Sequence, residues 1–185
     1  MEEKLIIAGF GGQGVMAMGQ LLTYSGMIED KNVSWLPSYG PEMRGGTANC
    51  SVILSDEPVG SPVVTDSTAS IVLNKPSLDK FENSVVPGGK LFINSSLIDK
   101  KSVRNDIDVY YIPANEIAIE LGNDKVANMV MLGAFLEATK LVDIESILKA
   151  FTKVFGENKA HLVPLNKEAL EKGAETIRNQ IKATV

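Results

Sequence analysis

A cluster of glycines directly after a short apolar run limits the folds open to this chain more than any other feature. Residues 5–8, Leu-Ile-Ile-Ala, are apolar without alternation, which predicts a strand buried on both faces. The chain continues as Gly9-Phe10-Gly11-Gly12-Gln13-Gly14. Glycine adopts positive φ and lets a ligand approach the backbone closely. The pattern therefore predicts a strand, a glycine-rich turn and then a helix, an arrangement typical of α/β proteins.

The turn is a candidate anion site, because backbone N–H groups at a helix N-terminus can hold a phosphate or a carboxylate. The alternative is that the glycines only make a tight turn and allow close helix–sheet packing. Gly9, Gly11 and Gly14 also fit the dinucleotide pattern G-x-G-x-x-G. That pattern needs an acidic residue at the end of the second strand, but Glu29 and Asp30 precede the expected strand. An NAD site is therefore disfavoured.

A second glycine-rich stretch covers residues 37–46, Pro-Ser-Tyr-Gly-Pro-Glu-Met-Arg-Gly-Gly, and predicts a loop. Within it, Arg44 is followed by Gly45 and Gly46, so its guanidinium could pair with a carboxylate or phosphate. A solvated Arg44, or one paired with Glu42, is an equal alternative. Tyr39 is a candidate ligand-facing aromatic or, equally, a packing residue. We expect both glycine-rich loops to contribute to one binding site.

The remaining pattern alternates strands and helices. Strands are expected at 4–9, 32–36, 47–54, 69–73, 90–94 and 108–112, and residues 87–89, Pro-Gly-Gly, are expected to form a turn. Helices are expected at 13–28, 76–85, 113–121, 125–139, 143–155 and 166–182. The prediction is one α/β domain over residues 1–185, with a Rossmann-like, largely parallel (mixed) sheet and flanking helices.

Composition narrows the function classes. The net charge of −5 and the absence of a basic run argue against nucleic-acid binding. No apolar run reaches the roughly 20 residues of a membrane span, and no signal peptide is recognisable, so a cytoplasmic protein is expected. Cys50 is the single cysteine, which excludes an iron–sulfur cluster held by this chain alone. Cys50 is expected to be a buried hydrophobe, and His161, the only histidine, a structural or surface residue. No metal site and no catalytic residue are predicted.

The two glycine-rich stretches and the helix motif at 128–134, Asn-Met-Val-Met-Leu-Gly-Ala, together resemble the gamma subunit of 2-oxoacid:ferredoxin (or acceptor) oxidoreductases. The resemblance spans nearly the whole chain, through residues 166–170, Asn-Lys-Glu-Ala-Leu. It is strongest for the 2-oxoglutarate type, and the unit is similar to the third domain of the fused pyruvate enzymes.

This resemblance implies oxidative decarboxylation of a 2-oxoacid to an acyl-coenzyme A by a multi-subunit complex. Thiamine diphosphate, magnesium and the iron–sulfur clusters are then expected in alpha and beta subunits, with a ferredoxin-like delta subunit as a further candidate. The acceptor is ferredoxin or another electron carrier. The two glycine-rich loops are expected at the subunit interface near the entry of coenzyme A. The alternatives are a stand-alone dinucleotide-binding enzyme and a purely structural scaffold subunit.

Overall fold

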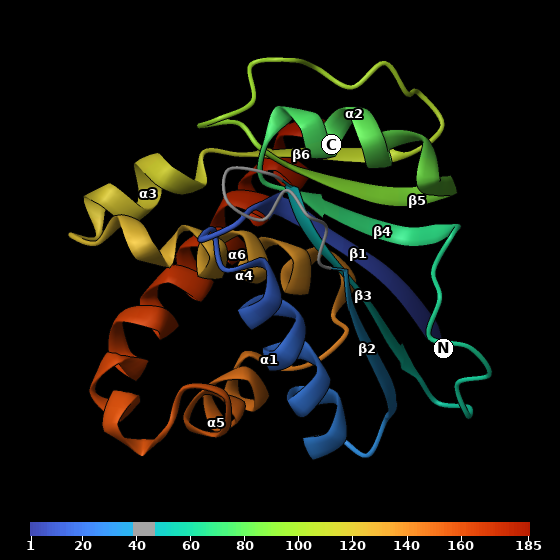
Figure 1. Cartoon of the computed structure of the whole chain (residues 1–185). Helices are drawn as coiled ribbons and strands as arrows, with labels where there is room; N and C mark the ends of the chain where they lie inside the picture. Colours follow the sequence, from blue (N-terminus) through green and yellow to red (C-terminus); the bar gives the residue numbers. More distant parts are fainter. Residues whose placement is uncertain (39–46) are drawn as a thin grey trace.

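The computed structural model describes residues 1–38 and 47–185, and these form a six-stranded sheet with helices on both faces (Figure 1). The strand order is β2-β3-β1-β4-β5-β6. The strands are β1 (Glu2–Phe10), β2 (Asn32–Ser38), β3 (Thr47–Ser55), β4 (Ser67–Val72), β5 (Val85–Asn94) and β6 (Asp108–Ile112). β1, β4, β5 and β6 run parallel, whereas β3 is antiparallel to both β1 and β2. The predicted α/β class and mixed sheet are confirmed.

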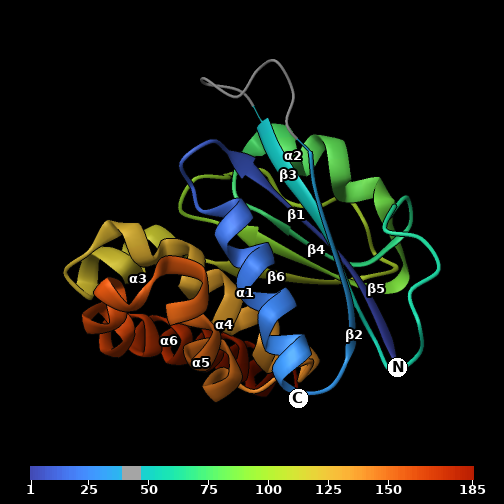
Figure 2. The same cartoon turned by 60° about the horizontal axis from the view of Figure 1, so that its bottom comes forward.

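The α-helices are α1 (Val15–Ile28), α2 (Lys75–Phe81), α3 (Ala114–Glu120), α4 (Ala127–Thr139), α5 (Ile144–Phe155) and α6 (Val163–Thr184). Short 3-10 turns are η1 (Glu82–Ser84), η2 (Asp124–Val126) and η3 (Glu157–Leu162). Figure 2 shows α1, α4, α5 and α6 on one side of the sheet and α2 on the other. The molecule is therefore a three-layer sandwich, with the larger helical layer on the α1 side.

The main core lies between the sheet and this larger layer. Strand side chains at alternate positions face it, among them Leu5, Ile7, Cys50, Val52, Ile71 and Phe92. α4 is buried continuously from Met129 to Leu136, because the sheet covers one side of this helix and α6 the other. On the opposite face, α2 and the chain after β5 cover a smaller cluster that includes Val72, Leu78, Leu91 and Ile98.

Several boundaries differ from the sequence prediction. The helix expected at 76–85 ends at Phe81 and is followed by η1, and Val85 already belongs to β5. Residues 87–89 were expected to form a turn, but they lie inside β5, where Gly88 has φ +81° and its N–H donates to Asp106 O at 2.7 Å. The β4–β5 register shifts between Ser67 and Ala69, so the Pro-Gly-Gly segment forms an irregularity within a strand. The last helix begins at Val163 rather than at residue 166, because Pro164 is accommodated in its first turn.

Candidate functional site

The glycine-rich turn joins the carboxyl end of β1 to the N-terminus of α1, as the sequence predicts. Gly12 has φ +90° and Gly14 has φ +79°, a region that L side chains rarely adopt. Gly11 and Gly12 are exposed, and Gln13 and Gly14 are partly exposed. Gly9, by contrast, is buried within β1, where an added Cβ would lie 2.9 Å from Leu73 Cβ. Gly9 therefore serves packing, and residues 11–14 form the accessible turn.

Gln13 closes the turn with its own side chain. Its Oε1 accepts a hydrogen bond from Phe10 N at 2.6 Å, and its backbone N–H donates to Phe10 O at 3.2 Å. Its Nε2 group donates to Leu73 O at 3.4 Å, at the end of the neighbouring strand β4. The sequence predicted Gln13 as a ligand-binding residue; in the structure its side chain fixes the shape of the turn against the sheet.

The N-terminus of α1 is open toward this turn. Helical hydrogen bonding begins with Met18 N donating to Gly14 O at 3.0 Å, so the N–H groups of Val15, Met16 and Ala17 precede the i→i−4 ladder. Gly14 occupies the N-cap position without a side-chain cap, and the first turn of α1 contains no acidic residue. The positive end of the helix dipole thus lies at the glycine-rich turn, and no carboxylate in the first turn of α1 compensates it.

The start of α4 packs against the same turn. Asn128 Nδ2 lies 3.5 Å from Gly14 O, and a Cβ added at Gly14 would come within 2.3 Å of Asn128 Nδ2. Gly14 is therefore required twice, for its positive φ and for the close approach of the Asn128 side chain. The motif at 128–134, noted in the sequence, meets the glycine-rich turn in space.

Three cavities border the turn. The amide cavity, of about 190 Å³, lies at the carboxyl ends of β1, β4 and β5 and is lined in part by Gly12, Gln13, Asn94, Asn115, Asp124 and Lys125. The apolar cavity, of about 370 Å³, extends from Gly12–Gly14 to Met129, Phe155, Leu162 and Leu165. The helix-start cavity, of about 290 Å³, lies between Phe10, the first turn of α1 and Ala48. All three include Gly12 in their walls.

Sequence reasoning missed the asparagines of the amide cavity. Asn94 ends β5 and is 2% exposed, and its Nδ2 group donates to Asn115 Oδ1 at 2.8 Å. Ser96 Oγ accepts hydrogen bonds from the N–H groups of Asn115 and Glu116, which caps α3. A signal for this pair existed, because Asn94 closes a strand and Asn115 follows the next one, and the carboxyl ends of parallel strands share an edge.

The second glycine-rich loop, with Tyr39, Arg44, Gly45 and Gly46, falls outside the described residues. The described chain leaves β2 at Ser38 and resumes at Thr47, which pairs with Phe10 at the end of β1. Both flanking points therefore lie at the edge of the sheet that carries the glycine-rich turn. The proposed ligand contacts of these four residues remain predictions.

Neither Cys50 nor His161 belongs to the site. Cys50 is 0% exposed in the core between β3 and α1, and burial raises the pKa of its thiol to about 12, so it remains protonated at neutral pH. His161 is exposed in η3. Both placements agree with the sequence-based interpretation.

The topology gives an independent argument against a dinucleotide site. In the dinucleotide-binding fold, the strand that carries the ribose-binding acid lies directly beside β1. Here β3 lies between β1 and β2, so the end of β2 is two strands away from the glycine-rich turn. Glu29 is used elsewhere: its Oε1 atom accepts hydrogen bonds from Asp143 N at 2.8 Å and Ser146 Oγ at 2.7 Å.

Fold and site thus define an α/β protein with a glycine-rich strand–turn–helix at the carboxyl edge of a mixed sheet. The sequence of residues 4–176 matches the model of the pyruvate ferredoxin/flavodoxin oxidoreductase family, and the chain belongs to this family. Over the described residues, none of the helices has the length and apolar content that a membrane span requires.

Subunits of 2-oxoacid oxidoreductases from other organisms align with most of this chain. It is 39% identical over 182 residues to the ketoisovalerate oxidoreductase subunit VorA of Methanothermobacter thermautotrophicus, covering 98% of this chain but 38% of VorA. It is 35% identical over 153 residues to the 2-oxoglutarate synthase subunit KorC of Methanocaldococcus jannaschii, covering 81% of this chain and 82% of KorC. The chain thus spans well under half the length of VorA and most of the length of KorC.

Solved structures share the fold. The gamma subunit of a keto/oxoacid ferredoxin oxidoreductase from Geobacter sulfurreducens superposes with a TM-score of 0.81 at 28% identity, covering 96% of this chain and 99% of that one. A 2-oxoglutarate:ferredoxin oxidoreductase from Magnetococcus marinus, solved with 2-oxoglutarate, coenzyme A and succinyl-CoA bound, gives 0.86 at 20% identity. The alignment covers 96% of this chain and 31% of the Magnetococcus chain, and at this identity the likeness concerns the fold.

Proposed function

We propose that this chain is the gamma subunit of a multi-subunit 2-oxoacid:ferredoxin (or acceptor) oxidoreductase, which converts a 2-oxoacid and coenzyme A to an acyl-coenzyme A and carbon dioxide. The support is the family match over residues 4–176, together with relatives named as subunits of ketoisovalerate, 2-oxoglutarate and pyruvate enzymes. Because these relatives span three substrate types, the 2-oxoglutarate type expected from the sequence stays a prediction.

The redox groups belong to partner subunits in this proposal. Cys50 is the single cysteine of the sequence and is 0% exposed, so the chain cannot supply the thiolate ligands of an iron–sulfur cluster. Thiamine diphosphate, magnesium and the clusters are therefore assigned to alpha and beta subunits, and to a ferredoxin-like delta subunit where one is present. The homologous unit makes up about two fifths of the longer VorA chain, where it is therefore covalently joined to a further segment.

The role proposed for this chain is to bind the phosphate-bearing part of coenzyme A at the glycine-rich turn. The observation that carries this role is the open N-terminus of α1, where Gly14 is the N-cap, no side chain caps the described helix start, and three cavities meet at Gly12. Backbone N–H groups and the helix dipole there favour a phosphate. The chain provides binding and orientation, and the decarboxylation chemistry is supplied by thiamine diphosphate in the partners.

Affinity purification of the tagged chain from its native extract, with mass spectrometry of the eluate, tests the subunit assignment. The eluate is then assayed for coenzyme-A-dependent viologen reduction with 2-oxoglutarate, pyruvate and 3-methyl-2-oxobutanoate. We expect thiamine-binding and iron–sulfur subunits to co-purify with activity toward one of these acids. Recovery of the chain alone, without such activity, would overturn the assignment.

A Gly12→Val variant of the complex tests the binding role. The added side chain forces a strained backbone at φ +90° and occupies space shared by the three cavities. We expect a higher KM for coenzyme A with intact assembly. Gly60→Val is the matched control, because a Cβ at Gly60 meets nothing within 4 Å. An unchanged KM in Gly12→Val would favour the purely structural scaffold.

A further inference from the structure

α1 is a surface helix without a charged residue. Its sequence, Val-Met-Ala-Met-Gly-Gln-Leu-Leu-Thr-Tyr-Ser-Gly-Met-Ile, contains no aspartate, glutamate, lysine or arginine over residues 15–28. In both Figure 1 and Figure 2, α1 lies in front of the other elements that the structure describes. The outer side of a helix that stays in water normally carries charged side chains, so the outer side of α1 is unusual.

This outer side carries apolar side chains instead. Tyr24 is 39% exposed, Met27 is 55% exposed and Ile28 is 40% exposed. Because residues three and four apart adjoin on a helix surface, these three side chains form one group at the end of α1. Met16 and Gln20, both partly exposed, continue the same side toward the glycine-rich turn. We call these five residues the α1 stripe.

The α1 stripe does not hold the helix to the rest of the molecule. Two glycines on the other side of α1 make the close contacts: a Cβ added at Gly19 would lie 2.7 Å from Cys50 Sγ, and one at Gly26 would lie 2.8 Å from Leu54 Cδ2. The sheet therefore packs against the buried side of α1. A substitution in the stripe can change what binds there while the fold stays intact.

The composition of the α1 stripe is that of the centre of a protein–protein interface, where methionine and aromatic side chains are enriched and charged ones are depleted. The stripe begins at the helix-start cavity, whose walls include Phe10, Gly12 and Met16. It is therefore continuous with the candidate site. Under the proposed function, a ligand at the glycine-rich turn reacts at thiamine diphosphate in a partner subunit, so that subunit must approach the same end of α1.

From this continuity we propose that the α1 stripe is covered by the subunit that holds thiamine diphosphate, through an uncharged, apolar surface of that subunit. The inference rests on the proposed function and adds the surface through which the two subunits associate.

A second copy of this chain is a poorer occupant of the α1 stripe. Asp30 is exposed two residues beyond the end of α1. In a pair of copies with parallel α1 helices, the two Asp30 carboxylates would lie side by side and repel each other. In an antiparallel pair, each Asp30 would lie at the glycine-rich turn of the other copy, where the proposed function requires an open site.

Photo-crosslinking in the purified complex identifies the occupant. Tyr24→p-benzoylphenylalanine keeps an aromatic ring in the α1 stripe, and mass spectrometry should find it crosslinked to the thiamine-binding subunit. Val103→p-benzoylphenylalanine is the control, because Val103 is 80% exposed beside η1 on the opposite side of the sheet; it should not crosslink to that subunit. A crosslink between two copies of this chain, a crosslink only to a subunit without thiamine diphosphate, or none would overturn the proposal.

Methionine oxidation gives a second readout without a substitution. Met27 and Met1 are each 55% exposed, so hydrogen peroxide should convert both to the sulfoxide at similar rates in the isolated chain. In the complex, Met27 should be oxidised about fivefold more slowly, in proportion to its lost exposure, while Met1 keeps its rate. Equal rates for Met27 in the isolated chain and in the complex would contradict the proposal.

Met27→Glu measures the contribution of the α1 stripe to assembly. A carboxylate in an apolar interface should raise the dissociation constant of the complex by about 30-fold or more, whereas Met27→Leu should keep the wild-type value. The circular dichroism spectrum and Tm of the isolated Met27→Glu chain should match wild type. If the wild-type chain recovers no partner subunit, the proposed function fails. If the complex forms and Met27→Glu binds as tightly as wild type, only the docking surface is wrong.

Discussion

Two glycines, Gly133 and Gly173, determine how closely α4 and α6 approach each other. A Cβ at Gly133 would lie 2.0 Å from Leu170 O, and a Cβ at Gly173 would lie 1.9 Å from Val130 O. In both cases the obstacle is backbone, which cannot move aside as a flexible side chain would. The contact is therefore reciprocal, and each helix accepts the backbone of the other at a residue without a side chain.

Gly133→Ala should lower the free energy of unfolding by about 3 kcal/mol or more, because the helices must separate to admit the methyl group. Urea titration followed by circular dichroism measures the change. Gly60→Ala, whose Cβ meets nothing within 4 Å, is the control and should be neutral or slightly stabilising. A Gly133→Ala protein as stable as Gly60→Ala would show that the helix contact is not tight.

Cys50 makes stability depend on alkaline pH. Burial raises the pKa of its thiol from an ordinary value near 9 to about 12. Between these values the unfolded chain loses the proton and the folded chain keeps it, so the folded state binds more protons. The free energy of unfolding should therefore fall as pH rises above about 9, by up to about 1.4 kcal/mol per pH unit from this group.

Comparison with Cys50→Ala isolates this contribution from the other groups that titrate at alkaline pH. The difference in unfolding free energy between wild type and variant should be constant below pH 9 and should shift in favour of the variant above it. Urea titrations at several pH values measure both proteins. A difference independent of pH up to 11 would contradict the burial argument.

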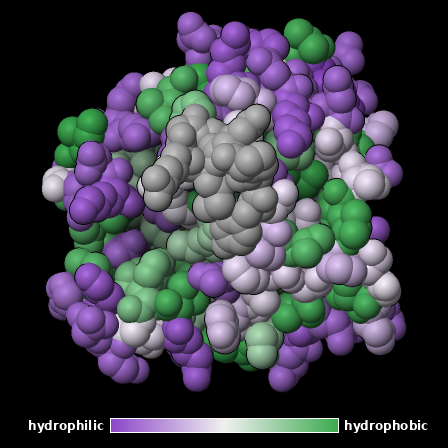
Figure 3. Space-filling view, viewed as in Figure 1, coloured by the Kyte–Doolittle hydropathy of each residue, from purple (hydrophilic) through white to green (hydrophobic). Residues whose placement is uncertain are grey.

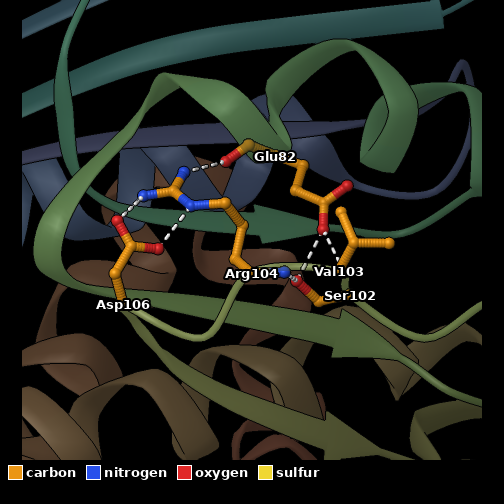
Figure 4. A network of polar contacts seen from close by, with 5 residues as sticks. All are labelled: Glu82, Ser102, Val103, Arg104 and Asp106. Atoms are coloured by element: carbon orange, nitrogen blue, oxygen red, sulfur yellow. Dashed lines mark hydrogen bonds and ion pairs between the residues drawn. The ribbon is translucent and has the colours of Figure 1, made fainter.

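At the scale of elements, the chain between β5 and β6 is fastened over the smaller core by a polar network (Figure 4). Glu82, 5% exposed, accepts hydrogen bonds from Ser102 Oγ at 2.5 Å and Val103 N at 2.9 Å. Arg104 donates to Glu82 O at 3.0 Å and pairs with both carboxylate oxygens of Asp106. These contacts join residues 102–104 to Glu82 of η1, and Ile98, which precedes them in the chain, lies in the smaller core.

Glu82→Ala should destabilise the protein by about 2–3 kcal/mol, because two donors lose a charged acceptor. Amide hydrogen exchange should quicken most in residues 95–107. Asp79→Ala is the matched control, since its ion pair with Lys100 is exposed at the surface of the same region. Equal effects of the two substitutions on exchange would argue against the fastening role of Glu82.

The sequence predicts most elements because each has a clear local pattern, but it does not predict how they pair. All six strands were expected near their observed positions, whereas the insertion of β3 between β1 and β2 depends on contacts across the sheet. The Pro-Gly-Gly of β5 has turn chemistry and was assigned to a turn, but in the structure it forms an irregularity inside the strand, where the β4–β5 register shifts and Gly88 has φ +81°. Pairing with β4 at Val85 and again from Lys90 continues the strand on both sides of this segment, which its local turn preference does not predict.

The site, too, was predicted where a local sequence pattern defines it and missed where it depends on tertiary packing. The turn before α1 and the positive φ of Gly12 follow from glycine chemistry and were predicted, whereas Gly14 was expected to allow close packing and has a positive φ as well. Lys125 was not predicted as a residue of the site, because a lysine in a short 3-10 turn carries no local sequence signal of function. Its place beside the glycine-rich turn results from the packing of α4 on α1, which only the folded chain reveals.

At the scale of the whole molecule, hydrophobic side chains remain exposed beside the site. Phe10 is 39% exposed at the helix-start cavity, and Phe155 is 38% exposed at the apolar cavity. On the face seen in Figure 3, hydrophobic residues form several separate groups among hydrophilic ones. A partner subunit that docks beside the glycine-rich turn would cover the Phe10 and Phe155 rings.

The isolated chain should therefore self-associate, and sedimentation velocity over a range of concentrations measures this. Phe10→Ser combined with Phe155→Ser should reduce the association. Val103→Ser is the control, since Val103 is 80% exposed in the fastened segment over the smaller core. A wild-type chain that stays monomeric at high concentration would contradict the interpretation that Phe10 and Phe155 belong to a docking surface.

α1 is held at both ends by the second half of the chain. Asn128 contacts Gly14 at its start, and Glu29 at its end binds Asp143, and each contact joins residues 114 positions apart. During synthesis, the glycine-rich turn thus emerges long before the residues that complete its surroundings. A nascent chain that ends before α4 carries the turn without the residues of α4 that line the cavities beside it, so under the proposed binding role ligand affinity would arise only with the finished fold. A ligand bound there would stabilise the whole molecule rather than one loop, because the cavity is lined by residues from both halves of the sequence.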